Sequence, residues 1–432
     1  MTMKLYFSDF FRCDVDDLEH YGALDVSLVA DLPLFIDPFL IFNSRKPAYQ
    51  GLHNEMIRYL RFLRDKSQGG PLPDGLTKSW FTFSEVKQNW LGYSFTGNNG
   101  RGLGPKFAKA LRANLTTVFR NFGDETITKG SHIEKLCLIK SGVGRDNISD
   151  FATNLIKNYL LEYTQKFAQQ SIDPRLLKKI YVEKVIFNWT TETWESHAFL
   201  LPWTGQDYVI LTPEDILTKD DTWISQSDLV RRYEHIASSV PNEQLRWNLD
   251  NYFRAALPKK PKGELHTQEE KTNAVVSVLE RFPEILDWYV KNREEDGTAA
   301  VKSSHRKVEE TKTLFIDQVS QLVNALERGG FYQPVKDSYE SSIERVKFLK
   351  KTIEDNDGYR FFYVDGEPIE REMDLQLVYR LTWYATPFEV DSEVNNGRGP
   401  VDYKISMGSA DKSLVEFKLA SNTKLEQNLG TC

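Results

Sequence analysis

The chain has 432 residues, of which 55 are basic and 62 acidic, so its formal net charge is −7. Because a negative total charge provides no general positive field, it excludes nucleic-acid binding through the surface as a whole and leaves only local basic patches for that role. Hydrophobic residues make up 40% and aromatic residues 12%, which excludes an intrinsically disordered chain, and the length favours two or three domains.

Residues 1–257 mix the patterns of helices and strands. Apolar side chains recur at helical spacing in YQGLHNEMIRYLRFLRDK, residues 49–66, which predicts a helix. The runs KLCLIK, residues 135–140, and DYVILT, residues 207–212, are typical of short strands. We therefore expect one mixed α/β domain in this part of the chain.

A glycine-rich stretch, GYSFTGNNGRGLGPKFAKALRANL, runs into a predicted helix at residue 105. Backbone N–H groups at a helix N-terminus can hold a phosphate, and Arg101 and Lys106 are suited to contact a nucleic-acid backbone. The stretch lacks the lysine spacing of a P-loop, so no nucleotide motif is supported. A plain glycine-rich loop is the alternative interpretation.

Several acidic residues beside glycine or proline have simple structural explanations. In SGVGRDNISDFATNL, Ser149 or Asp150 is suited to cap the helix that follows, and a second acidic site is the alternative. Asp37 precedes a proline in DLPLFIDPFLIF, which favours a role in a turn over one in catalysis. The histidines are scattered singly, so we assign none to a metal.

Residues 258–268, within LPKKPKGELHTQEE, interrupt the aromatic-rich sequence and predict a linker. Residues 269–357 then show helical spacing of apolar side chains, which predicts a helical segment with solvated charged faces. The expected helices cover residues 272–293, 312–330 and 338–355.

Residues 358–432 form the last predicted module. GYRFFYVDGEPI is typical of a hairpin that turns at Asp365 and Gly366, and EREMDLQLVYRLTWYA predicts a helix that carries Glu372. The runs PVDYKISM and SLVEFKLA, separated by GSADKS, predict a second hairpin.

The second predicted hairpin carries two acidic residues and a lysine that could form a metal site. Alternation along a strand places Asp402 on one face of its strand, and Glu416 and Lys418 share a face of the other. If the register sets Asp402 near Glu416, these two carboxylates and the backbone carbonyl of Phe417 suit Mg²⁺, or Mn²⁺, which prefers oxygen ligands. Lys418 would then stabilise charge on a phosphodiester. A hairpin with ordinary charged faces is the alternative.

These residues resemble the PD-(D/E)XK nuclease superfamily, whose core is a mixed sheet flanked by helices. The resemblance implies that Asp402 and Glu416 hold the metal, that Lys418 is the catalytic lysine and that Glu372 assists from the helix. Gln427 lies where some relatives place a glutamine. Only 14 residues follow Lys418, so we expect a shortened core, a core that a partner completes, or an incomplete active site.

The fold class that we predict is therefore mixed α/β (α+β), with an N-terminal mixed domain, a helical middle segment and a C-terminal restriction-endonuclease-like module. The function that the resemblance implies is metal-dependent phosphodiester hydrolysis, on DNA rather than RNA, in prokaryotic restriction or anti-phage (antiviral) defence. Residues 1–257 would sense a trigger or position DNA, and Arg398, Lys404, Arg101 and Lys106 would contact nucleic acid.

A binding or scaffold protein with an inactive nuclease-like module is the alternative function. It would use the helical segment for assembly, as a homo-oligomer or with a partner protein. The cysteines Cys13, Cys137 and Cys432 have no metal-ligand spacing, which favours a reducing compartment. With no signal peptide and no long apolar run, we expect a cytoplasmic protein without membrane contact.

Overall fold

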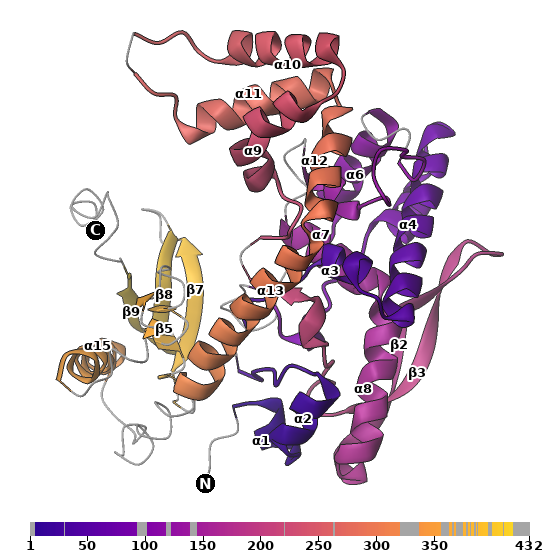
Figure 1. The fold of residues 1–432 in the computed structure, drawn as a ribbon. Coiled ribbons are helices and arrows are strands. Elements are labelled where there is room, and N and C mark those ends of the chain that lie inside the picture. Colours follow the sequence, from indigo (N-terminus) through magenta and orange to yellow (C-terminus); the bar gives the residue numbers. More distant parts are fainter. Residues whose placement is uncertain are drawn as a thin grey trace.

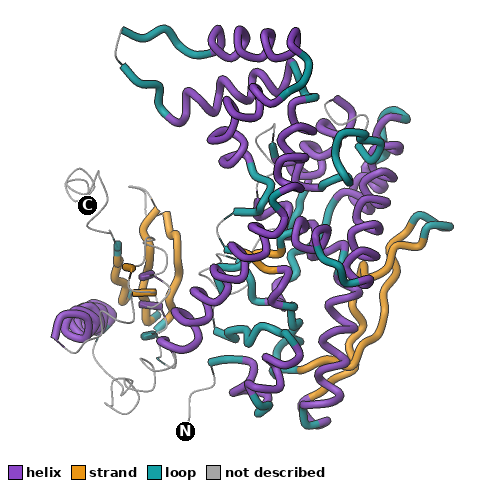
Figure 2. The backbone as a smooth tube through the Cα atoms, in the orientation of Figure 1, coloured by secondary structure: helices purple, strands orange, loops and turns teal. Residues whose placement is uncertain are grey.

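The computed structural model shows a mixed α/β protein, mainly helical with several small antiparallel sheets, so the predicted fold class is confirmed (Figures 1 and 2). It describes residues 5–29, 31–92, 102–117, 122–138, 145–219, 221–261, 264–319, 337–355, 363–364, 367–368, 375–376, 379–380, 382–383, 386, 388–395, 400–408 and 410–417. Within these residues, no helix is both long and apolar enough to cross a membrane.

The N-terminal part is built mainly from helices. Its elements are α1 Phe7–Phe11, α2 Val15–Tyr21, β1 Phe35–Ile36, α3 Pro38–Asn43, α4 Pro47–Gln68, α5 Asp74–Phe81, η1 Lys87–Asn89, α6 Pro105–Thr117, η2 Ile133–Cys137, α7 Arg145–Leu155, α8 Lys157–Ser171, η3 Pro174–Leu176, β2 Leu177–Asn188, β3 Thr193–Pro202, η4 Glu214–Ile216 and β4 Leu217–Thr218. The predicted helix at residues 49–66 is confirmed as α4. It begins with a proline at its first position and buries Tyr49, Met56, Leu60 and Leu63 on one face.

A long antiparallel hairpin, β2 with β3, lies beside α8 at the edge of the molecule (Figure 1). Its pairing shifts between Val182 and Ile186, and Lys184 within this irregularity has a φ of 51°. The hairpin packs partly buried tryptophans against the core: the ring centroids of Trp194 and Tyr59 lie 5.2 Å apart. This hairpin was not predicted from the sequence.

The helices that follow form a group at one end of the molecule, from which α13 runs toward the C-terminal sheet (Figure 1). Their bounds are α9 Gln226–Ser239, α10 Glu243–Ala256, α11 Gln268–Arg281, α12 Ile285–Glu295 and α13 Gly297–Lys312, with a π-helical continuation, η5 Thr313–Gln318. Gly297 permits the close approach of α13 to α3, because a Cβ at this position would lie 2.2 Å from Asn43 Oδ1. Asn43 Nδ2 donates to the Gly297 carbonyl at 3.1 Å.

In the C-terminal part, the described residues include the helix α15, helical residues at 375–376 and 379–380, and two small sheets. The elements are α15 Ser338–Asp355, β5 Tyr363–Val364, β6 Glu367–Pro368, β7 Glu389–Asn395, β8 Pro400–Met407 and β9 Asp411–Val415. β5 pairs with β6, and β7, β8 and β9 form an antiparallel sheet in that order. Ser338, the first residue of α15, donates from its backbone N–H to Asp411 Oδ2 at 2.9 Å, which holds the helix against β9.

Several predicted elements are confirmed by the structure. α15 has the predicted bounds of residues 338–355, the helix after the glycine-rich stretch is α6, and both C-terminal hairpins are present. Asp37 caps α3 by accepting the N–H of Phe39 at 3.0 Å, as its turn position suggested. Residues 258–261 and 264–267, within the predicted linker, have no regular structure and lie between α10 and α11.

Other predicted elements were wrong. Residues 133–137 form the 3₁₀-helix η2 rather than a strand, because Lys135 turns inward to pair with Asp287 Oδ1 at 2.5 Å. Residues 209–211 are buried but hydrogen-bond to three separate segments, through Pro202, Gln88 and Thr164, so no strand ladder forms.

Some predicted helix boundaries also differ from those in the structure. The helix predicted at residues 272–293 ends at Arg281, because Pro283 has no N–H to continue it. Of the helix predicted at residues 312–330, residues 313–318 form η5 and residues 320–330 lie outside the described residues. Ser149 and Asp150 lie inside α7, where the Ser149 hydroxyl accepts the N–H of Ile36 at 3.0 Å, so neither of them caps that helix.

Candidate functional site

The two acidic positions that the sequence singled out lie at one end of the β8–β9 hairpin. The ladder pairs Lys404 with Leu414 and Tyr403 with Val415 and ends there, because β9 stops at Val415. Asp402 and Glu416 are the next residues on the two sides of the hairpin beyond this last pair. The hairpin therefore brings the backbone of positions 402 and 416 close together.

This acidic face is the outer face of the sheet. The Phe417 ring packs against Tyr379, with ring centroids 4.9 Å apart, and Tyr403 is buried beside it. Because side chains alternate along a strand, Asp402 and Glu416 point away from that core. Asp402 is half-buried and Glu416 is exposed, so an ion and its waters can reach both.

The Asp402 carboxylate is anchored by the neighbouring strand. The backbone N–H of Phe417 donates to Asp402 Oδ2, which fixes the carboxylate beside the backbone of Phe417. A carboxylate oxygen has more than one lone pair, so this hydrogen bond does not prevent it from binding a metal. Two hard oxygen donors on one accessible face fit Mg²⁺, which commonly takes one or two carboxylates and completes its shell with water.

The same face carries further charges on β7. Lys404 Nζ lies 2.9 Å from Asp391 Oδ2, and the two residues oppose each other in the ladder, so the lysine expected to contact nucleic acid is engaged in an ion pair. The pairs on either side of Asp402 place position 393 of β7, a glutamate, across from it. Sequence reasoning did not consider this position, although a third adjacent strand could have suggested it.

The remaining predicted site residues are distributed as follows. Lys106 is exposed in the first turn of α6. Four predicted site residues lie outside the described residues: Glu372, Lys418, Arg398 and Arg101. Gln427, the glutamine of the resemblance, also lies outside them. Among the described residues, no group of three or more His, Cys, Asp or Glu side chains is arranged to hold a metal ion.

A basic groove lies beside the start of α6. Its volume is about 1000 Å³, and its lining includes Lys78, Lys109, Arg112 and Lys184, with Asp74 as the acidic member. Lys109 and Arg112 come from the helix that the sequence associated with phosphate. The two other lysines come from α5 and from the irregularity in β2, so no local motif could have revealed them. Clustered cations of this kind suit a nucleic-acid backbone.

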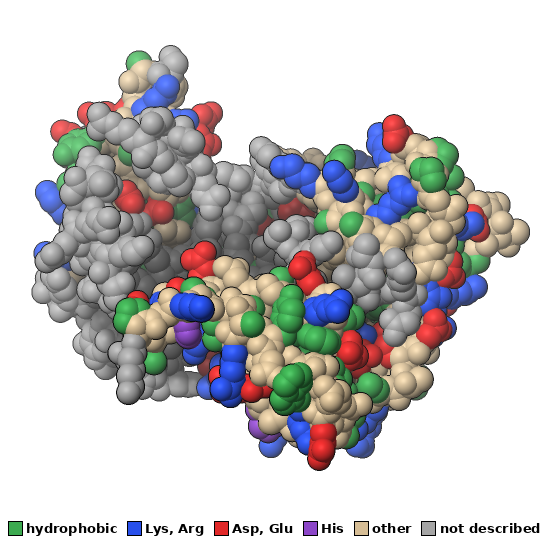
Figure 3. Space-filling view, turned by 90° about the horizontal axis from the view of Figure 1, so that it is seen from above, with side chains coloured by type: hydrophobic (Ala, Val, Ile, Leu, Met, Phe, Trp, Pro, Cys, Tyr) green, Lys and Arg blue, Asp and Glu red, His purple; other side chains and the backbone are tan. Residues whose placement is uncertain are grey.

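The surface charge around these sites is otherwise mixed. In Figure 3, which views the molecule from the side of α10, basic and acidic side chains alternate over the described surface. This pattern agrees with the negative net charge and means that nucleic acid would be attracted by a local feature such as the basic groove.

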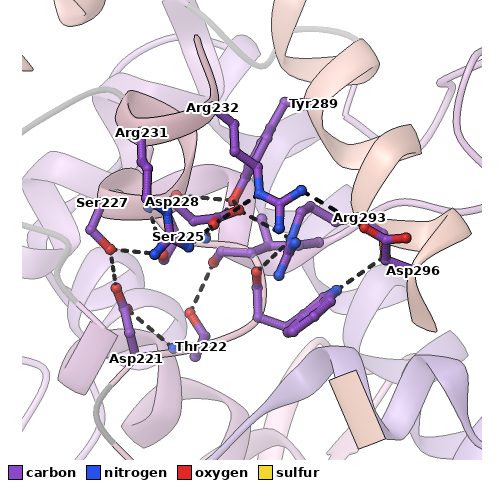
Figure 4. Close-up of polar contacts among 12 residues, drawn as sticks. Asp221, Thr222, Ser225, Ser227, Asp228, Arg231, Arg232, Tyr289, Arg293 and Asp296 are labelled. Atoms are coloured by element: carbon purple, nitrogen blue, oxygen red, sulfur yellow. Dashed lines mark hydrogen bonds and ion pairs between the residues drawn. The ribbon is translucent and has the colours of Figure 1, made fainter. Parts of the chain in front are cut away.

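A second constellation, which the sequence did not suggest, surrounds Asp228 near the N-terminus of α9 (Figure 4). Three arginines reach this one buried carboxylate: Arg231 Nη2 contacts Oδ1, Arg232 Nε lies 3.1 Å from Oδ1, and Arg293 Nε lies 3.2 Å from Oδ2. Arg232 also lies 3.8 Å from Asp296. Because three guanidinium groups meet two carboxylates, the cluster carries excess positive charge.

This arginine cluster borders a cavity of about 780 Å³. Its wall combines residues from α9, α11, α12 and α13 with Asp37 and the segment 218–225. Ser225 caps α9 by accepting the N–H of Asp228 at 3.3 Å, and Tyr289 of α12 donates its hydroxyl proton to the Ser225 carbonyl at 3.0 Å. These bonds fix the helix end at the cavity.

Two buried acids lie close to the cavity wall. Burial raises the pKa of Asp37 above its ordinary value, although its carboxylate accepts N–H groups of Trp223 and Phe39. Burial and the nearby charge of Asp37 also raise the pKa of Glu134. Both acids therefore hold their protons to higher pH than exposed carboxyl groups do.

Two family models match separate parts of the chain. Residues 14–225 match a domain of unknown function (DUF8370), and residues 338–431 match another domain of unknown function (DUF8371). The second match begins at the first residue of α15 and includes the acidic hairpin. Searches of the curated proteins and of the solved structures found no match. The hairpin and the N-terminal part thus match different family models.

Proposed function

We propose that this chain is a divalent-metal-dependent nuclease that hydrolyses phosphodiester bonds, with DNA as its substrate. The observation that supports the proposal most directly is the β8–β9 hairpin, in which the Phe417 N–H donates to Asp402 Oδ2 and so brings the backbone beside Glu416 close to Asp402. The same residues carry the resemblance to the PD-(D/E)XK superfamily.

Each residue of the proposed site has a distinct task. Asp402 and Glu416 would hold Mg²⁺ or Mn²⁺, with the carbonyl of Phe417 as a further oxygen ligand. When bound, the ion supplies a nucleophilic water at neutral pH and neutralises charge on the scissile phosphate. Lys418 would stabilise that charge, and Glu372 would assist. The Phe417 N–H keeps the Asp402 carboxylate oriented toward the site.

The basic groove gives the proposal a route for the substrate. Lys109, Arg112 and their neighbours in the lining would bind the phosphate backbone, with Arg101, Lys106, Lys404 and Arg398 as further contacts. An N-terminal recognition part joined to a nuclease module favours a role in prokaryotic restriction or anti-phage defence in the cytoplasm. A homo-oligomer or a partner protein would complete or trigger the module.

The test is cleavage of plasmid, linear and single-stranded DNA and of RNA, with Mg²⁺ or Mn²⁺, by the wild type and by Asp402→Asn, Glu416→Gln and Lys418→Ala. Asp402→Asn keeps an oxygen that can accept the Phe417 N–H, so the hairpin should fold. Two controls match these changes outside the proposed site: Glu389→Gln on β7 and Lys412→Ala on β9, both exposed in the structure.

We expect metal-dependent cleavage in the wild type and both controls, and its loss by about 100-fold or more in the three site variants. Cleavage that survives Asp402→Asn and Glu416→Gln would place the chemistry elsewhere and end the proposal. A folded wild type that binds DNA but cuts none of the substrates with either metal would favour the alternative, a binding protein with an inactive nuclease-like module.

A further inference from the structure

The cavity beside Asp228 contains a cation with unused hydrogen-bond donors. Arg293 has an exposed fraction of only 3% and lines the cavity. Its Nε donates to the Trp223 carbonyl at 3.0 Å, but within the described part of the chain its Nη1 is buried and has no hydrogen-bond partner. A buried donor without an acceptor costs about 1 to 3 kcal/mol, and more when it is charged, so this arrangement favours an acceptor from outside.

Three of the four acids that line the cavity, in contrast, already have donors, and the fourth, Glu234 of α9, is exposed to solvent. Asp37 accepts backbone N–H groups of Phe39 and Trp223, and Asp221 accepts the Ser227 hydroxyl at 2.5 Å and the Thr222 N–H at 3.1 Å. Asp228 is surrounded by its three arginines. Among the described residues of the cavity, the buried groups that still lack hydrogen-bond partners are therefore donors, which suits an anionic ligand rather than a cation.

Further cations line the cavity from other helices. Lys307 of α13 donates to the Lys219 carbonyl at 3.1 Å and keeps additional N–H donors for a ligand. Lys271 of α11 also lines it and has no ion-pair partner among the described residues. Together with Arg293 these residues line the cavity from three helices, α11, α12 and α13.

The cavity is too large for an inorganic anion alone. Its volume of about 780 Å³ is that of a pocket for an organic molecule. Part of its wall is apolar and aromatic: Val230, Tyr233, Phe253 and Val275. The rings of Tyr233 and Phe253 lie 4.6 Å apart, and the valine of α11 is 1% exposed. A ligand that fills the cavity must therefore combine an anionic group with a ring system.

We propose that this cavity binds a small phosphate-bearing molecule of nucleotide size. Its phosphate is bound by Arg293, Lys307 and Lys271, and its ring system lies against Tyr233 and Phe253. The guanidinium of Arg293 stacks on Trp223, and its Nη1 is the donor left for a phosphate oxygen. This site is separate from the acidic hairpin, and the proposal holds whether or not the hairpin cuts nucleic acid.

The test is calorimetric titration of the full chain with AMP, ATP, adenosine and inorganic phosphate. We expect AMP or ATP to bind at least about tenfold more tightly than adenosine or inorganic phosphate, because only the nucleotides use both walls of the cavity. Equal binding of phosphate and AMP would overturn the assignment of an organic ligand. Failure of all four to bind would overturn the proposal.

Variants then locate the binding. Lys307→Gln and Lys271→Ala should each weaken nucleotide binding by about tenfold, the loss expected for one charge-assisted contact. Lys302→Gln, an exposed lysine of α13 outside the cavity lining, is the control and should bind as the wild type does. Arg293→Lys retains the charge but loses the Nη1 donor and should weaken binding further. Unchanged affinity in both lysine variants would place the ligand at another site and contradict the proposal.

Discussion

Arg293 and Trp223 hold each other by reciprocal contacts. The guanidinium carbon lies 3.5 Å from the centre of the indole ring, Arg293 Nε donates to the Trp223 carbonyl at 3.0 Å, and Trp223 Nε1 donates to the Arg293 carbonyl at 3.0 Å. The pair joins α12 to the segment that precedes α9. It therefore sets the position of the cavity wall independently of any ligand.

Replacement of this indole should destabilise the protein measurably. Trp223→Phe removes the hydrogen bond to the Arg293 carbonyl and weakens the stacking, which together should lower the free energy of unfolding by about 1 to 2 kcal/mol. Urea denaturation would measure the change. Trp247→Phe is the matched control, because this indole of α10 is 65% exposed and its variant should stay within about 0.5 kcal/mol of the wild type. Equal effects of the two changes would contradict the importance of the pair.

Removal of the charge of Asp228 should have a larger effect. Asp228→Asn leaves the buried Arg293 without its carboxylate, and loss of one partner of a buried ion pair costs about 3 to 5 kcal/mol. Asp250→Asn serves as the comparison, because the pair of Asp250 with Arg254 on α10 is exposed and contributes about 0.5 kcal/mol or less. Thermal unfolding of both variants would show whether the Asp228 cluster is structural, and a small shift for Asp228→Asn would argue that it is not.

The raised pKa of Glu134 predicts a dependence of stability on pH. Its side chain is buried, and the folded state therefore keeps a proton that the unfolded state loses above the ordinary value of 4.5. Glu134 therefore does not lower the free energy of unfolding below that pH. As the pH rises above it, ionisation of Glu134 in the unfolded state should lower the free energy of unfolding by up to about 1.4 kcal/mol per pH unit. Glu134→Gln stays neutral and should reduce this slope, whereas Glu280→Gln, at an exposed position of α11, should not. Urea denaturation at several pH values would test both, and an unchanged slope in Glu134→Gln would contradict the assignment.

The acidic hairpin could be predicted from the sequence, but the arginine cluster could not. Strand alternation and a short turn restrict the register of a hairpin, so the pairing of β8 with β9 followed from local pattern. Arg293 stands at the polar end of a helix whose pattern is ordinary, and its burial arises only when α12 packs against the start of α9. Its partners Asp228 and Trp223 lie more than 60 positions earlier in the chain, and no local spacing connects them.

The basic groove makes a prediction about nucleic-acid binding that does not depend on cleavage. Lys109→Glu reverses a charge in the groove lining, so it should weaken DNA binding and lower the slope of log affinity against log salt by about 1 to 2. Lys166→Glu, at an exposed position of α8, is the control for the change in net charge. Lys106→Glu shows whether the contact extends over the first turn of α6. Equal weakening by Lys109→Glu and Lys166→Glu would mean that DNA responds only to total charge, and the groove would then have no specific role.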